Sequence, residues 1–163
     1  MNALLDLFHH KTWATLKLIE HCRKFDEEGL SAEMPGTYGS IIATLNHLVH
    51  ADIDYIRMLE GGPEPEVSPA SLDVLAERFQ AAVPRWEKAL SDEGIQDSEI
   101  TLDDGYRMRG SVPIAQSIHH AEVHRTHVLS ILGGKGYESP ELDIWAYAME
   151  AELAREPEEA SPG

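Results

Sequence analysis

The chain has 163 residues, of which 42% are hydrophobic, and this length and composition are typical of one globular domain. Its 29 acidic and 13 basic residues give a formal net charge of −16, which repels polyanions and argues against nucleic acid as a partner. The single cysteine, Cys22, excludes an internal disulfide and a thiolate metal cluster. Because the sequence shows neither a signal-peptide pattern nor an apolar run of about 20 residues, we expect a cytoplasmic protein with no membrane partner.

The first half of the sequence has the spacing of two amphipathic helices. Apolar residues recur every three to five positions over 3–23 and again over 40–60, as they do on one face of a helix. The stretch PGTYGS at 35–40 interrupts this pattern, and it offers Thr37 or Ser40 as the cap of the second helix.

A third helix follows a loop rich in glycine and proline. The loop covers 61–69 by composition, and Ser68-Pro69 is expected to open the helix. Apolar residues then step by three and four as far as Leu90. Pro84 lies inside this pattern, where its ring and missing N–H are expected to kink the helix.

The last third of the sequence contains a hairpin and two further helices. Residues 99–109 alternate around a turn at Asp104-Gly105, which predicts a small β-hairpin. A fourth long helix is expected from a cap at Ser111 to Gly133-Gly134, and 141–150 is expected to form a short helix.

Together these elements predict an all-α fold, a four-helix bundle with a small β-hairpin insertion before the fourth helix. One domain is expected over 1–153, and 154–163 are expected to form a flexible C-terminal tail because they combine glutamate, proline and serine with few apolar residues.

The stretch HHAEVHRTHV at 119–128 holds four of the nine histidines. On a helix, His120 and His124 project from one face, and His127 lies about 20° from His120. Two histidines four residues apart can bind one divalent ion without distorting the helix, although many such pairs arise by chance. His119 points to the opposite side and is expected to be solvated.

A metal ion needs a third ligand from another element, and the helix over 40–60 offers two histidines. His47 shares a stripe with Tyr55, which can face a cavity in the bundle. His50 shares a stripe with Asp54, which suggests solvent. His47 is therefore the better candidate, with an ordinary surface histidine as the alternative.

Four segments, in this order and spacing over 3–150, resemble the DinB/YfiT-like family of bacterial four-helix-bundle proteins. They are LFHHKTWATLKLIEHC, GSIIATLNHLVHADIDYIRML, the DDG hairpin followed by IHHAEVHRTHV, and ELDIWAY. In that family three histidines bind a divalent metal, and the resemblance places these ligands at His47, His120 and His124. It also implies a homodimer.

The sequence departs from the family pattern after Arg125. Thr126 and His127 stand where glycine and glutamine are usual. His127 is therefore a candidate for a further ligand or for a proton-transfer group, and whether His127 or His50 also contacts the metal is left open.

Three neutral imidazoles do not cancel the +2 charge of a divalent ion, and they leave at least one coordination position open. This is the pattern of catalytic rather than structural sites. Such an ion can lower the pKa of bound water, which suits hydrolysis, or deprotonate a thiol, which suits S-transfer. Imidazole nitrogen suits zinc, nickel, iron or copper. The resemblance implies either activity, with a low-molecular-weight thiol for the transfer to a small electrophile.

Tyr55 and His127 are the candidate catalytic acid–base groups, and the alternative for Tyr55 is a packing residue. Three hypotheses about function follow. The first is a metal-dependent enzyme acting on a small molecule, with S-transfer ahead of hydrolysis. The second is a non-catalytic metal-binding bundle with a role in the stress response. The third is a helical interaction domain in which the histidines are inert.

Overall fold

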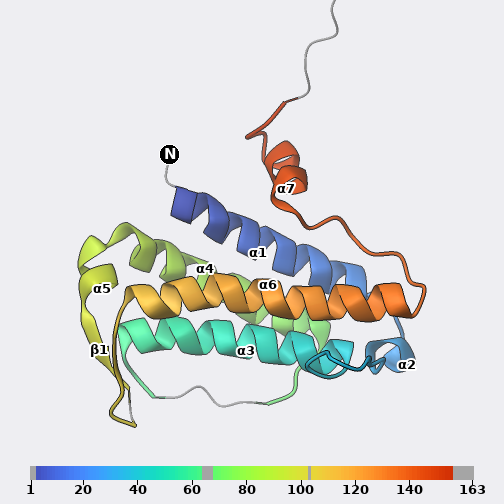
Figure 1. Ribbon diagram of the computed structural model, residues 1–163, viewed down its shortest axis with the longest axis horizontal. Helices are drawn as coiled ribbons and strands as arrows, with labels where there is room; N and C mark the ends of the chain where they lie inside the picture. Colours follow the sequence, from blue (N-terminus) through green and yellow to red (C-terminus); the bar gives the residue numbers. More distant parts are fainter. Residues whose placement is uncertain (1–2, 64–67, 103, 156–163) are drawn as a thin grey trace, which may run out of the picture.

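The computed structural model describes residues 3–63, 68–102 and 104–155. Within these ranges the chain forms seven helices and one two-stranded hairpin (Figure 1). The four long helices are α1 (Ala3–Cys22), α3 (Ile41–Glu60), α4 (Leu72–Ser91) and α6 (Ser111–Gly134). The short elements are α2 (Glu27–Leu30), α5 (Glu93–Asp97), β1 (Glu99–Thr101), β2 (Arg107–Arg109) and α7 (Ile144–Glu150). The predicted four-helix bundle with a hairpin before its fourth helix is confirmed.

The long helices pack side by side around an apolar interior. The helix α3 packs most extensively on α6, and α1 packs on α4. In Figure 1, α3 and α4 run in one direction and α1 and α6 in the other, so the connection between α3 and α4 has to return along the bundle. All four helices supply fully buried apolar side chains, among them Leu18, Leu45, Leu48, Phe79, Trp86 and Val128.

Serine caps begin α3 and α4. The side chain of Ser40 accepts a hydrogen bond from the backbone N–H of Ala43. Ser40 is therefore the cap, and it was one of the two residues predicted for this position. The predicted opening of the next helix at Ser68-Pro69 is wrong, since α4 begins at Leu72 behind the cap Ser71. The reason lies in Ala70, whose backbone N–H and C=O are both bonded to a side chain of α3 and are therefore unavailable to a helix.

The start of α6 also differs from the prediction. Ser111 is its first residue and not its cap, because the preceding position is Gly110 and no side chain caps the helix. The backbone N–H of Gly110 donates to the carbonyl of Ser98 at 2.9 Å. A Cβ on Gly110 would lie 2.0 Å from the carbonyl oxygen of Ile95, so only glycine allows this close approach between α5 and α6.

The hairpin pairs β1 with β2 in antiparallel register, with Ile100 opposite Met108. Gly105 has a φ of +86° in the turn, a conformation that glycine adopts without strain. Pro84 does not end its helix, since α4 continues through it to Ser91.

A buried ion pair crosses the interior between α1 and α3. The ammonium of Lys11, which is fully buried, donates to one carboxylate oxygen of Asp52. The other oxygen accepts a hydrogen bond from the indole N–H of Trp86 at 2.9 Å. The rings of Phe8, Trp86 and Phe79 surround the ammonium at 4.2, 4.7 and 5.4 Å. Burial lowers the pKa of Lys11, and the charge and hydrogen bond of Asp52 oppose that shift.

A second buried cation joins α6 to the same helix. Arg125 donates to the carbonyl oxygen of Lys11 at 3.3 Å and to the hydroxyl of Thr15 at 3.0 Å, and it also bonds Glu122. Lys11 is therefore bonded to α3 through its side chain and to α6 through its backbone. These contacts fix the relative position of the two helices that carry the candidate metal ligands.

The helix α7 packs on the outside of α1. Trp13 and Lys17 donate to the carboxylate of Glu150 at 2.9 and 2.8 Å, and an imidazole nitrogen of His10 lies 2.7 Å from the carbonyl oxygen of Leu142. None of the described helices is long and apolar enough to cross a lipid bilayer. The predicted tail lies almost wholly outside the described residues, and the predicted domain boundary stays a prediction.

Candidate metal centre

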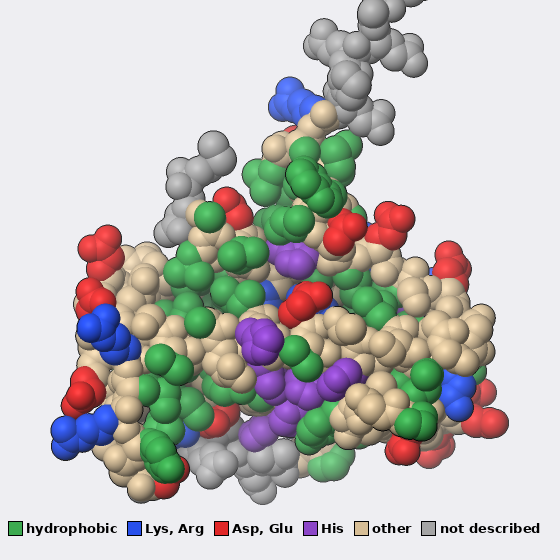
Figure 2. Space-filling view, viewed as in Figure 1, with side chains coloured by type: hydrophobic (Ala, Val, Ile, Leu, Met, Phe, Trp, Pro, Cys, Tyr) green, Lys and Arg blue, Asp and Glu red, His purple; other side chains and the backbone are tan. Residues whose placement is uncertain are grey.

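Three histidines meet where α3 and α6 lie side by side. His47 comes from the middle of α3, while His120 and His124 lie on consecutive turns of α6. Nitrogen Nε2 of His47 lies 3.0 Å from Nε2 of His120, and one ring nitrogen from each of the three residues lies within 4.8 Å of the others. Figure 2 shows histidine side chains gathered in the middle of the face that α3 and α6 present. We call His47, His120 and His124 the three-histidine cluster.

Tyr38 covers the cluster from the loop before α3. Its ring stacks on the imidazole of His47, with 4.1 Å between centroids and 13° between planes. The same ring meets the imidazole of His124 edge-on at 5.1 Å. Tyr38 is 52% exposed, so it shields the imidazoles without sealing them from solvent.

The local environment keeps the cluster neutral. Burial, reinforced by the neighbouring histidines, lowers the pKa values of His120 and His124 from 6.5 to about 4. Burial and the charge of His50 lower the pKa of His47 as well. At neutral pH all three imidazoles are therefore unprotonated and keep a lone pair for a cation, which is the state that metal binding requires.

One ring nitrogen of the cluster has no hydrogen-bond partner among the described residues. Nitrogen Nδ1 of His124 is buried and has no hydrogen-bond partner within the part of the chain that the structure describes. Buried polar atoms normally have a partner, and a bound ion can be that partner. Three neutral imidazoles from two rigid helices form a donor set that fits a divalent transition metal, and the cluster can hold such an ion. This donor set does not select among zinc, nickel and iron.

The two predicted acid–base groups lie beside the cluster. The phenol ring of Tyr55 meets the imidazole of His120 edge-on at 5.6 Å, and its hydroxyl accepts a long hydrogen bond of 3.5 Å from Gln116. The imidazole of His127 meets that of His124 edge-on at 5.3 Å, and its buried Nδ1 lacks a partner among the described residues. Neither residue is part of the cluster, and their catalytic roles stay predictions.

His119 and His50, the remaining histidines of these two helices, are not part of the cluster. His119 is exposed, as its position on α6 predicted. His50 is half-buried, so the expectation that it faces solvent is met only in part, and it lines a cavity beside α3.

A sequence profile of the DinB family matches residues 1–159. The chain belongs to the DinB family. This finding confirms the resemblance seen in the sequence. A comparison with curated proteins finds no match.

The fold of this DinB protein is also found in a solved structure. The crystal structure of a DinB-like protein from Bacillus cereus ATCC 10987 superposes with a TM-score of 0.64 at 19% identity. The match covers 85% of this chain and 94% of that chain. At this identity the likeness concerns the fold alone.

Sequence reasoning did not identify Tyr38 as part of the site. The available signal was an aromatic residue just before the cap of the helix that carries His47. It also missed the buried pair of Lys11 and Asp52, because helical spacing marks apolar faces and does not show which charged residues are enclosed.

Proposed function

We propose that this DinB protein binds a divalent transition metal through His47, His120 and His124 and uses it for chemistry on a small molecule. The observation that carries the proposal is the convergence of three neutral imidazoles from two helices, with ligand atoms within 4.8 Å of one another. A bound divalent ion with an open position would supply Lewis acidity and a deprotonated water or thiol.

S-transfer to a small electrophile is the reaction that we favour, with hydrolysis as the alternative. A specific observation bears on the source of the sulfur. Cys22 is fully buried, and burial raises the pKa of its thiol to about 12, so the chain itself offers no reactive thiolate in the described region. We therefore propose that the thiol comes from outside the chain, as the low-molecular-weight thiol that the family resemblance implies, and the cytoplasm keeps such thiols reduced.

The residues around the cluster have distinct roles in this proposal. Tyr38 excludes water from one side of the cluster through its stacked ring. His127 and Tyr55 hold or move a proton in this proposal. Each carries an acid–base group, and its ring contacts the imidazole of a candidate metal ligand. His127 fits this role better, since its buried Nδ1 has no partner among the described residues.

Metal analysis of protein purified without a histidine tag tests the first step. We expect about one ion per chain, as for a single three-ligand site. His124→Ala should weaken binding by more than the roughly 10–100-fold that loss of a hydrogen-bond partner around a metal costs. His119→Ala is the matched control, because it removes an exposed imidazole from the same helix and should leave binding unchanged. Full metal retention in His124→Ala would rule out the ligand assignment.

Activity assays test the second step. A panel of low-molecular-weight thiols with small electrophiles, and a panel of simple esters and amides, should show turnover that chelation abolishes and metal restores. Metal binding without any turnover would favour the non-catalytic stress-response bundle instead. Light scattering of the pure protein checks the homodimer that we propose from the family resemblance.

A further inference from the structure

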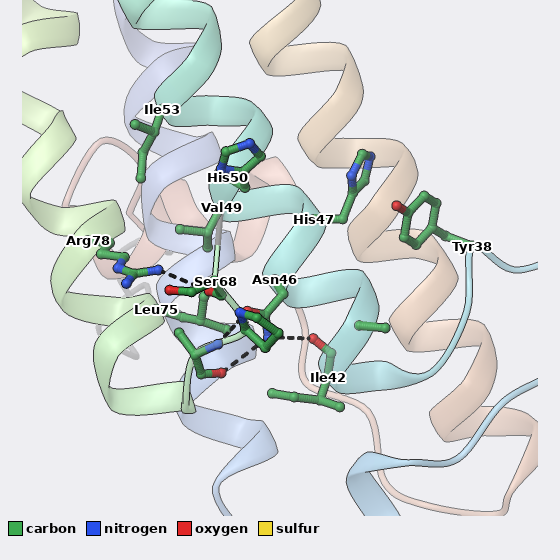
Figure 3. Close-up of a pocket in the computed structure, with 13 residues that line it drawn as sticks. Tyr38, Ile42, Asn46, His47, Val49, His50, Ile53, Ser68, Leu75 and Arg78 are labelled. Carbon is green, nitrogen blue, oxygen red and sulfur yellow. Dashed lines mark hydrogen bonds between the residues drawn. The ribbon is translucent and has the colours of Figure 1, made fainter. Parts of the chain in front are cut away.

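A cavity of about 810 Å³ lies along the outer side of α3, next to the three-histidine cluster. Its lining on α3 runs from Ile42 to Ile53, about 16 Å at the rise of an α-helix. Tyr38 and His47 form one side of it and α4 the other (Figure 3). Most of its surface is apolar, supplied by Ile42, Val49, Ile53, Pro69, Ala70 and Leu75. This size suits a small organic ligand.

Hydrogen bonds hold the described wall of the cavity in place. The side chain of Asn46 accepts from the N–H of Ala70 at 2.8 Å and donates to its carbonyl at 3.2 Å. Arg78 donates from Nη1 to the carbonyl of Ser68 at 3.4 Å. Residues 68–70 are therefore tied to both α3 and α4, and the cavity exists before any ligand arrives. Both N–H groups of the Asn46 amide are used by these bonds and by the carbonyl of Ile42, so this amide has no N–H left to donate to a ligand.

The described lining of the cavity carries permanent charge of one sign. Arg78 is the one permanently charged residue in its described lining, and no described aspartate or glutamate contributes, although the whole chain carries 29 acidic residues. Atoms Nε and Nη2 of Arg78 have no hydrogen-bond partner within the part of the chain that the structure describes. In Figure 3 this guanidinium lies on the opposite side of the cavity from His47 and Tyr38.

This arrangement selects an anion of low charge. A guanidinium presents parallel N–H groups that match a carboxylate. One arginine balances one negative charge, whereas a net charge of −16 on the protein repels a dianion such as a phosphate monoester.

We propose that the cavity binds the substrate of the metal-dependent reaction, and that this substrate is a small molecule with an apolar body and a single carboxylate. The apolar body packs along α3, the carboxylate is bound by Arg78, and the opposite end lies at His47 beneath Tyr38. The position of the reacting end rests on the proposed function. The binding of the apolar acid does not, because it uses only the cavity and Arg78.

The test uses metal-free protein, so that a carboxylate cannot bind to an ion instead. Octanoate, 1-octanol and octyl phosphate share one alkyl chain and differ in the head group, and their affinities are compared by calorimetry. We expect octanoate to bind most tightly. Arg78→Ala should weaken octanoate binding about 10-fold or more, as loss of a hydrogen bond to a charged group does. It should leave 1-octanol unchanged, because the two bonds between Asn46 and Ala70 still hold the cavity wall when the long bond from Arg78 to Ser68 is lost.

Two further variants make the result specific. Arg85→Ala is the matched control, because Arg85 lies two turns further along α4, bonds Glu60 and does not line the cavity. Ala43→Phe adds a ring at an exposed lining position and should block octanoate and 1-octanol alike. Arg78 is exposed, so its loss should leave the thermal unfolding midpoint unchanged.

Equal binding of octanoate to the wild type and Arg78→Ala would overturn the proposal, as would equal affinity for octanoate and 1-octanol, or preference for octyl phosphate. None of these outcomes would change the result of the metal analysis, which tests the proposed function separately. Conversely, a protein that binds octanoate through Arg78 but takes up no metal would refute the proposed function and keep the cavity as a site for apolar acids.

Discussion

The buried pair of Lys11 and Asp52 yields the sharpest stability prediction. Their side chains are 1% and 3% exposed, so neither charge is solvated. In Lys11→Met the apolar stem of the side chain is largely preserved, and the thioether suits the surrounding aromatic rings. The carboxylate of Asp52, however, keeps only the indole N–H of Trp86. Removing one partner of a buried pair typically costs about 3–5 kcal/mol, which is a large part of the usual 5–15 kcal/mol of a domain.

A second substitution should reverse part of this loss. In the double variant Lys11→Met with Asp52→Asn, the amide oxygen still accepts from Trp86 and no charge is left in the interior. The amide NH2 group, with its two N–H donors, is left unpaired, and an unsatisfied buried group costs about 1–3 kcal/mol. The double variant should therefore be more stable than the single variant Lys11→Met, although it carries one more substitution.

Urea unfolding of the metal-free proteins at pH 7, followed by circular dichroism, measures these differences without stabilisation by bound metal. Lys17→Met is the control, because Lys17 lies on the same helix and pairs with the exposed Glu150, a surface contact worth less than about 1 kcal/mol. The reasoning is refuted if Lys11→Met lies within about 1 kcal/mol of the wild type, or if the double variant is the least stable protein.

Three further predictions concern single groups. The free energy of unfolding of the metal-free protein should fall as the pH drops from 6.5 towards 4, because His120 and His124, with pKa values of about 4 when folded, take up protons on unfolding; alanine at both positions should flatten this slope. Cys22 should resist iodoacetamide at pH 8 in the native protein and react in urea, because burial raises its pKa to about 12; rapid native labelling would contradict the burial. Gly110→Ala should destabilise the fold by about 1–3 kcal/mol, because its Cβ meets a backbone oxygen, whereas Gly133→Ala, which meets nothing within 4 Å, should be neutral or stabilising in urea unfolding.

The fold and the candidate site differ in how far the sequence predicts them. Helical periodicity is a local property, so it placed the long helices and put His120 and His124 on one face of α6. The angular difference between His47 and His50 also proved informative, since only His47 lies in the three-histidine cluster. Tyr38 lies in a loop without periodicity, and its stacking on His47 depends on the path of the chain before α3.

Helical periodicity did not predict the contacts between segments that lie far apart in the sequence. The bonds between Asn46 and Ala70 join residues 24 positions apart, and they decide where α4 begins. In the sequence Arg125 was only the last residue that follows the family pattern, and its buried contacts with α1 depend on the packing of two helices and not on the local pattern.

The adjacent residues His124 and Arg125 contact two different helices. The imidazole of His124 contacts His47 of α3, and Arg125 donates a hydrogen bond to Lys11 of α1. An inserted or deleted residue before this pair would rotate everything after it by about 100° and would disturb both faces at once. The number of residues between His120 and Arg125 therefore has to stay constant if both helix contacts are to form together.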